Sequence, residues 1–128
     1  SKMAQETASE LLATAIDVNG VTIVNAEVEI EDMDGLRNLA DLLRDKLTVG
    51  VIVLGAKIAD DKVNFVVMAT KDAVAKGIHA GNIIKETAKV AGGGGGGRPD
   101  MAQAGGKNPK KITEALTMAT EVITKQIG

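Results

Sequence analysis

The chain has 128 residues, enough for one domain that buries about two thirds of the surface its unfolded form exposes. It contains no cysteine, which excludes disulfides and thiolate chemistry, and Phe65 is its one aromatic residue, so the core must be aliphatic. The formal net charge of −2 hides an asymmetry, because residues 1–70 carry 6 basic and 12 acidic side chains whereas residues 71–128 carry 9 and 5.

The first predicted element is a helix over residues 2–16, which Asn19-Gly20 then ends. Its apolar residues follow the 4, 3, 4 spacing of one helix seam: Ala4, Ala8, Leu11 and Ala15. Because this seam is rich in alanine and weak, we expect residues 1–18 to be the end of a longer helical connector and residues 19–128 to form one globular domain. Alternatively, the helix simply packs on that domain. The chain opens without a methionine, which favours a piece of a longer protein.

The next elements predict a mixed sheet. Residues 21–30 alternate apolar and polar side chains, the pattern of a half-buried strand with an acidic exposed face. Residues 33–47 place leucines at helical spacing, with Asp34 as the expected N-cap. Residues 49–58 and 63–70 are near-continuous apolar runs, which predict a hairpin of two strands covered on both faces. The order strand, helix, strand favours a right-handed parallel crossover for the first pair.

Beyond Lys71 the strand pattern disappears and helices are predicted. A helical turn is expected over residues 72–76, and residues 80–91 place one apolar face along a helix that ends at a glycine. Asn108 as N-cap and Pro109 at the first helical position open a last helix. Its predicted buried face comprises Ile112, Ala115, Leu116, Ala119 and Ile123. The expected fold class is therefore α/β. It is a single mixed sheet of three or more strands, with one parallel crossover plus a hairpin, covered by helices, and with a glycine-rich loop between the last two helices.

The glycine-rich segment, residues 91–109, reads AGGGGGGRPDMAQAGGKNP. Glycine inside a helix or strand costs about 0.5–1 kcal/mol relative to alanine, so six in a row indicate backbone that needs positive φ or lies against something with no side chain between. A flexible linker is the alternative, but a stiff and varied stretch follows the run at once. The start of the last helix should offer unpaired N–H groups to a phosphate, beside Lys107, Lys110 and Lys111.

The basic half of the chain contains this segment. Lysine and arginine supply most sequence-independent affinity for nucleic acids by neutralising phosphates, although an ordinary solvated face explains the same charges equally well. No apolar run approaches the roughly 20 residues of a membrane span, and no signal-peptide core is present. A membrane partner is therefore not expected, and a cytoplasmic location is.

Other kinds of site are disfavoured. With one histidine, His79, and no cysteine, the chain cannot assemble a zinc site of the usual kind, and His79 is expected to start a helix or to pack. The acidic cluster of residues 27–34 is expected to be a solvated edge leading into a helix start. Residues 105–107 (GGK) resemble the end of a phosphate-binding loop, yet Asn108 stands where serine or threonine is required.

Two stretches carry a family resemblance. Residues 92–106, GGGGGGRPDMAQAGG, follow HAGNIIKETAKVAGG at residues 79–93, and together they resemble the glycine-rich signature of the DHH-associated domain as it occurs at the C-terminus of alanyl-tRNA synthetases. The resemblance covers residues 21–127. It implies a tRNA-binding domain that contacts the tRNA outer corner and supports aminoacylation and editing by the rest of the enzyme. The fragment alone would not be an enzyme, whereas the parent chain would be an alanine–tRNA ligase.

The resemblance and the charge pattern together indicate which residues bind RNA. They are Lys85, Lys89, Gly92, Gly93, Gly94, Gly95, Gly96, Gly97, Arg98, Asp100, Gln103, Gly105, Gly106, Lys107, Lys110 and Lys111. No catalytic or metal-binding residue is implied. The parent enzyme would use ATP, Mg and Zn, but no cofactor is expected in this stretch. The implied partners are tRNA, specifically alanine tRNA in the parent, and the other synthetase domains, with a possible weak homodimer.

Two alternatives remain. The substrate-binding half of a DHH-type phosphodiesterase or exonuclease shares the fold, but those glycines are typically followed by a histidine that contacts the scissile phosphate, where this chain has Arg98 and Pro99. The metal-binding residues of the catalytic half are also missing. A dimerisation module is the other alternative, for which only residues 2–16 remain.

Overall fold

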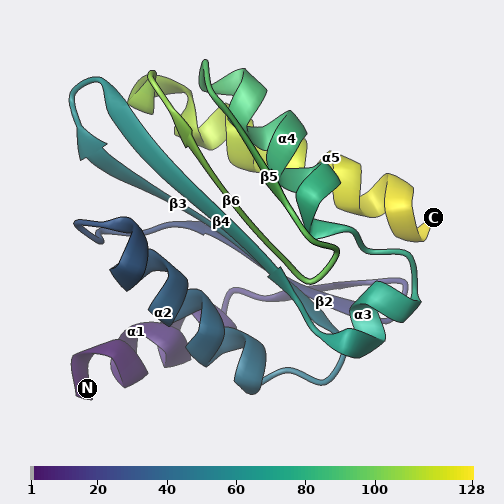
Figure 1. Ribbon diagram of the computed structural model, residues 1–128. Helices are drawn as coiled ribbons and strands as arrows, with labels where there is room; N and C mark the ends of the chain where they lie inside the picture. The colour runs from purple at the N-terminus through teal and green to yellow at the C-terminus, as the bar shows by residue number, and fades with distance from the viewer. Residues whose placement is uncertain (1) are drawn as a thin grey trace.

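A six-stranded β-sheet organises the computed structural model, which describes residues 2–128 (Figure 1). The strand order is β1-β2-β3-β4-β6-β5, and β2 and β3 form the one parallel pair. The strands are β1 (Ile16–Val18), β2 (Val21–Glu27), β3 (Gly50–Ala59), β4 (Lys62–Ala69), β5 (Gly94–Gly97) and β6 (Met101–Gly106). The helices are α1 (Lys2–Leu12), α2 (Met33–Asp45), α3 (Lys71–Ala75), α4 (Ala80–Val90) and α5 (Ile112–Ile127), with a 3-10 turn η1 (Pro109–Lys111). The predicted α/β class with a single mixed sheet is confirmed.

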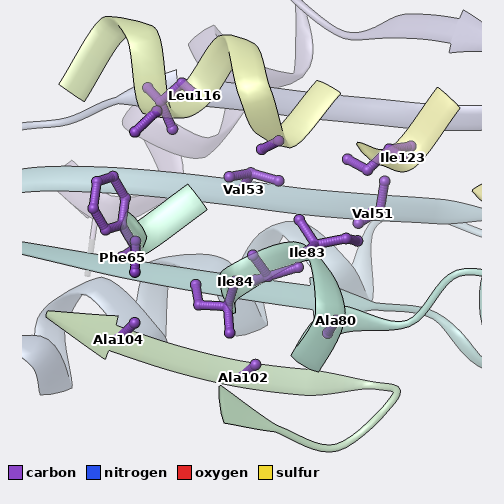
Figure 2. Packing of buried hydrophobic residues seen from close by; sticks show 14 of the residues in the cluster. Val51, Val53, Phe65, Ala80, Ile83, Ile84, Ala102, Ala104, Leu116 and Ile123 are labelled. Atoms are coloured by element: carbon purple, nitrogen blue, oxygen red, sulfur yellow. The ribbon is translucent and has the colours of Figure 1, made fainter. Parts of the chain in front are cut away.

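Helices cover both faces of this sheet and create two cores (Figure 1). On one face α2 packs against β3 and β4, with α1 beside it. On the other face α5 lies over β2 and β3, and α4 lies over β4, β5 and β6. Figure 2 shows Phe65 within the second core, where it is fully buried, and Ile84 of α4 directed towards the strand that carries Ala102 and Ala104. The central strands contribute to both cores, which explains their continuous apolar sequences.

The N-terminal helix is shorter than predicted, because α1 ends at Leu12 and Ile16 belongs to β1. Asn19 and Gly20 have φ values of 51° and 83° and join β1 to β2, so this pair is a hairpin turn and not a helix stop. Two-residue turns with both residues at positive φ match the twist of paired strands, and Asn-Gly is their strongest sequence signal. Ser1, part of the expected 1–18 connector, lies outside the described residues.

Two further details of the first half were wrong. The N-cap of α2 is Asp32, whose side chain accepts the Gly35 N–H at 2.7 Å, whereas Asp34 lies in the first turn. The face of β2 expected to be exposed is instead covered by α5. On this face the Asn25 side chain donates to the Leu116 carbonyl at 2.7 Å and to Thr120 Oγ1 at 2.8 Å. The strand ends at Glu27, and acidic exposure begins only there.

The largest correction concerns the glycine-rich segment. It lies between the last two helices as predicted, but it forms the antiparallel pair β5 and β6 and is not an irregular loop. The prediction that strands end before Lys71 was therefore wrong. Its strands consist mostly of glycine and alanine and show no apolar period, so the sequence pattern that reveals a strand is absent here.

The helices of the second half agree with the prediction. Every residue expected on the buried face of α5 is buried. His79 is the N-cap of α4, where its Nδ1 accepts the Asn82 N–H at 3.1 Å, so its expected role at a helix start is confirmed. Within residues 2–128, no helix has the combination of length and apolar character that a bilayer crossing requires.

Candidate nucleic-acid interface

The glycine hairpin, defined here as residues 92–106, forms the edge of the sheet beyond β4. Its outer strand β5 consists of four exposed glycines and is the last strand in the sheet order. Both ends of β5 are tied to α4. At the turn, the Ala80 and Gly81 N–H groups donate to the carbonyls of Pro99 (2.8 Å) and Arg98 (3.1 Å), and at the other end the Gly93 N–H donates to the Ala88 carbonyl (2.8 Å). Helix α4 therefore holds an all-glycine edge strand in a fixed position.

On the α4 side of the hairpin, the glycines are required by the close approach of the two strands. A Cβ atom on Gly93 would collide with the Gly105 carbonyl oxygen, and one on Gly95 would collide with the Ala104 side chain. At Gly97 it would lie 2.5 Å from the Met101 carbonyl oxygen. No side chain fits in these positions without moving backbone, so these three glycines have a structural explanation.

On the α2 side of the hairpin, the glycines have no such explanation. A Cβ atom on Gly94 or Gly96 would have nothing within 4 Å, and neither residue has a positive φ. Register pairs Gly96 with Gln103, and Met101, two residues earlier on β6, packs with the core beneath α2. The partly exposed Gln103 side chain therefore lies on the same open face as Gly94 and Gly96.

The free edge of β5 offers backbone groups as well as open space. The Arg98 N–H donates to the Met101 carbonyl at 2.9 Å, so Arg98 and Met101 form a hydrogen-bonded pair of the two strands. In an antiparallel hairpin every second residue pair is hydrogen-bonded, so the next bonded pair is Gly96 with Gln103. Gly95 occupies a non-bonded pair, and its N–H and C=O point away from β6. Because glycine carries no side chain, an external group can approach these backbone atoms closely.

Apart from Lys85, the charged residues predicted to bind RNA fall into two groups at opposite ends of the hairpin. Arg98 lies at the turn, where it is 71% exposed and pairs with Asp100 at 3.3 Å. The second group lies at the open end, because the N–H groups of Lys107 and Asn108 both donate to the Ala91 carbonyl at the end of α4. The five residue steps between Met101 and Gly106 along β6 separate the two ends by about 17 Å. This open-end group consists of Lys89, Lys107, Lys110 and Lys111.

The ion pairs of these residues leave them accessible to phosphate. Lys89, 63% exposed, lies 3.7 Å from Glu86, and Lys111, 45% exposed, lies 3.3 Å from Glu114. Exposed pairs of this kind contribute about 0–1 kcal/mol, so a phosphate can replace the carboxylate at little cost. Lys85, which is also exposed, lies one turn before Lys89 on the outer face of α4.

The helix N-terminus expected to receive a phosphate is already satisfied. The Asn108 side chain accepts the Lys110 N–H at 3.2 Å, and the Asn108 carbonyl accepts the Lys111 N–H at 3.0 Å. The Ile112 N–H bonds to the Pro109 carbonyl. The expectation of unpaired N–H groups here was therefore wrong, and only the lysine ammonium groups remain for an anion.

Arg37, which no sequence pattern singled out, contacts the hairpin from α2. Its Nη1 donates to Gln103 Oε1 at 3.4 Å and its Nη2 pairs with Asp34 at 2.9 Å. The contact joins residues 66 positions apart, so no local pattern could have revealed it. Within residues 2–128, no three His, Asp or Glu side chains gather as a metal site would require.

The sequence and the fold of this chain are similar to those of known proteins. Residues 20–125 match the model of the DHHA1 domain. The whole chain is 55% identical to part of the alanine–tRNA ligase of Alkaliphilus oremlandii and 59% identical to part of that of Acetivibrio thermocellus, and it spans 14% of the length of each. Among solved structures, the C-Ala domain of Aquifex aeolicus alanyl-tRNA synthetase superimposes with a TM-score of 0.78 and 37% identity, over 86% of this chain and 97% of that one.

Proposed function

Because the chain belongs to the DHHA1 domain family, in the form found as the C-Ala domain of alanyl-tRNA synthetases, we propose that it is the tRNA-binding domain of an alanine–tRNA ligase. In this proposal it contacts the outer corner of folded tRNA and supports aminoacylation and editing by the other domains of that enzyme. Those domains and tRNA are its proposed partners, and the cytoplasm is the compartment that follows.

The observation that carries this proposal is the exposed all-glycine strand β5 with basic side chains at both ends. Arg98 at one end and Lys107 at the other could each meet a phosphate, and the glycine backbone between them allows an RNA strand to approach closely. The separation of the two ends favours a ligand with several phosphates on one surface over a mononucleotide.

The chain can bind RNA by shape and backbone contacts, but it cannot stack several bases. Phe65 is fully buried, and the sequence has no tryptophan or tyrosine. Aromatic platforms, which hold single-stranded bases for about 1–3 kcal/mol each, are therefore unavailable. Contacts with phosphates and ribose 2′-hydroxyls of a structured RNA remain, and the corner where the D and T loops of tRNA meet presents both.

The chemistry of the parent enzyme belongs to other domains in this proposal. This chain offers one histidine and no cysteine, a set that does not fit a zinc site, and its glycine run lacks the features of a nucleotide-binding loop. We assign ATP, Mg and Zn to the remainder of the ligase. The phosphodiesterase alternative is disfavoured by the high identity to ligases and by Arg98 at the position of the expected histidine.

The proposal is tested by measuring the affinity of the chain for transcribed alanine tRNA over a range of salt concentrations. We expect the logarithm of the association constant to fall linearly with the logarithm of salt concentration, because binding releases counterions from the phosphates. Undetectable binding at low salt, or an affinity that salt does not change, would refute a phosphate-facing surface on this domain.

A further inference from the structure

The side-chain amide of Gln103 is oriented by a single partner. Arg37 Nη1 approaches Gln103 Oε1 at 3.4 Å, and a guanidinium group can only donate hydrogen bonds. The amide oxygen must therefore face Arg37, and the amide nitrogen must face away from it. Among the described residues, none accepts a hydrogen bond from that nitrogen. Gln103 consequently presents two free N–H donors on the α2 side of the glycine hairpin.

Arg37 makes a second contact at the same time. Its Nη2 lies 2.9 Å from Asp34 Oδ1, one helical turn earlier on α2, and its side chain is only 38% exposed. An arginine held in this way is better placed to orient a neighbour than to neutralise a phosphate. Two contacts in sequence therefore link Asp34 and Arg37 on α2 to Gln103 on β6, next to the edge of the sheet.

The free donors of Gln103 belong to a side chain on a face of the hairpin that a ligand can reach. Gln103 pairs in register with Gly96, and neither Gly96 nor Gly94 carries a side chain on this face. Nothing within residues 2–128 requires glycine at these two positions, although glycine weakens a strand. A close external approach to this face accounts both for the glycines and for the unpaired amide nitrogen.

We propose that Arg37 is a positioning residue for RNA binding, which holds the Gln103 amide so that its N–H groups donate to an acceptor oxygen of the RNA sugar–phosphate backbone. The proposal rests on the tRNA-binding function proposed above, and it adds the α2 side of the glycine hairpin as the surface that RNA contacts. Gln103 touches the ligand, whereas Arg37 acts through Gln103.

The experiment measures tRNA affinity and its salt dependence for variants of the whole chain. Gln103→Glu keeps the size of the side chain and strengthens its pairing with Arg37, yet it removes both donors. Because the added negative charge also repels RNA, Gln103→Met, which keeps the length of the side chain without donors or charge, is measured beside it. We expect both variants to weaken binding, Gln103→Met by about fivefold, the equivalent of one lost hydrogen bond. Gln103→Ala should give a similar loss, with circular dichroism confirming that the fold is retained.

Arg37→Met isolates the positioning role. We expect it to weaken binding severalfold with an unchanged salt slope, and to have no further effect in a Gln103→Ala background. Arg44→Met is the matched control, because Arg44 lies seven residues later on α2 and pairs with Asp41 at 2.8 Å but contacts Met68 instead of Gln103. This control should bind tRNA as the unmodified chain does.

Two results would overturn the inference while leaving the proposed function intact. One is a full effect of Arg37→Met in the Gln103→Ala background with a salt slope reduced by about 1, which would make Arg37 a direct phosphate contact. The other is unchanged binding by Gln103→Glu and Arg37→Met while Arg98→Ala and Lys107→Ala weaken it. If the unmodified chain does not bind tRNA at all, the proposed function fails and the inference fails with it.

Discussion

At the scale of single residues, the six consecutive glycines have three different physical roles. Gly92 has a φ of 72°, in the left-handed region, and ends α4. The glycines on the α4 side allow β5 to approach β6 more closely than any side chain would permit. Gly94 and Gly96 meet neither requirement, so their effect on stability and their effect on binding should be separable.

The first prediction compares Gly96→Ala with its neighbour Gly97→Ala. Alanine fits freely at Gly96 and restricts the unfolded chain, so the free energy of unfolding should rise by about 0.4–1 kcal/mol, while tRNA affinity should fall. At Gly97 the new Cβ would lie 2.5 Å from the Met101 carbonyl oxygen, so the free energy of unfolding should fall by about 1–3 kcal/mol. Urea unfolding and tRNA binding measure both quantities, and equal destabilisation by the two variants would contradict the assignment of the two faces.

The second prediction concerns the two ends of the hairpin. Arg98→Ala and Lys107→Ala should each weaken tRNA binding and lower the magnitude of the salt slope by about 1, as expected for the loss of one phosphate contact. Because both side chains belong to exposed positions, circular dichroism should be unchanged. Unaltered affinity with a retained fold would mean that the basic half of the chain is an ordinary solvated surface.

At the scale of secondary-structure elements, the sequence predicted those whose apolar residues repeat with a clear period. The buried face of α5 and the leucine face of α2 follow from such periods, and the hairpin of β3 and β4 follows from its two continuous apolar runs. The strands of the glycine hairpin could not be predicted from the sequence, because their small residues show no periodic hydrophobicity. Hydrogen bonds to α4 hold them in place instead. Arg37 could not be predicted because its role depends on a contact between α2 and β6.

The third prediction tests how α4 is anchored. His79→Ala removes the side-chain acceptor for the Asn82 N–H, so the free energy of unfolding should fall by about 0.5–2 kcal/mol. His79→Asn should retain most of this stability, since asparagine is a favoured N-cap. Thermal unfolding of the two variants is the measurement. If both lose the same amount, His79 stabilises the chain through packing and not through its capping hydrogen bond.

At the scale of the whole molecule, the N-terminal helix α1 packs against other elements of the same chain. Ala8 is fully buried, and α1 packs beside α2 on the sheet. The exposed large apolar residues among residues 2–128 are Met3 and Ile16, which lie on different elements. Stable interfaces bury about 1,200–2,000 Å² in total, far more than two isolated side chains provide.

The fourth prediction follows from the small number of exposed large apolar side chains among the described residues. We expect the chain to be a monomer, or at most a weak dimer, at micromolar concentration. Sedimentation velocity over a hundredfold range of concentration measures this directly. A tight dimer throughout the range would favour the dimerisation-module alternative, and would require an interface that the apolar residues do not explain.

In the proposed function, this domain recognises the folded corner of tRNA by shape and backbone contacts. A competition series tests it most directly, with folded alanine tRNA, a folded non-cognate tRNA, a tRNA whose loop–loop contacts are disrupted, and an unstructured oligonucleotide of equal length. We predict equal binding of the two intact tRNAs, weaker binding of the disrupted tRNA and the weakest binding of the unstructured strand. Equal binding of the unstructured strand, or strong discrimination between the two intact tRNAs, would contradict the claim.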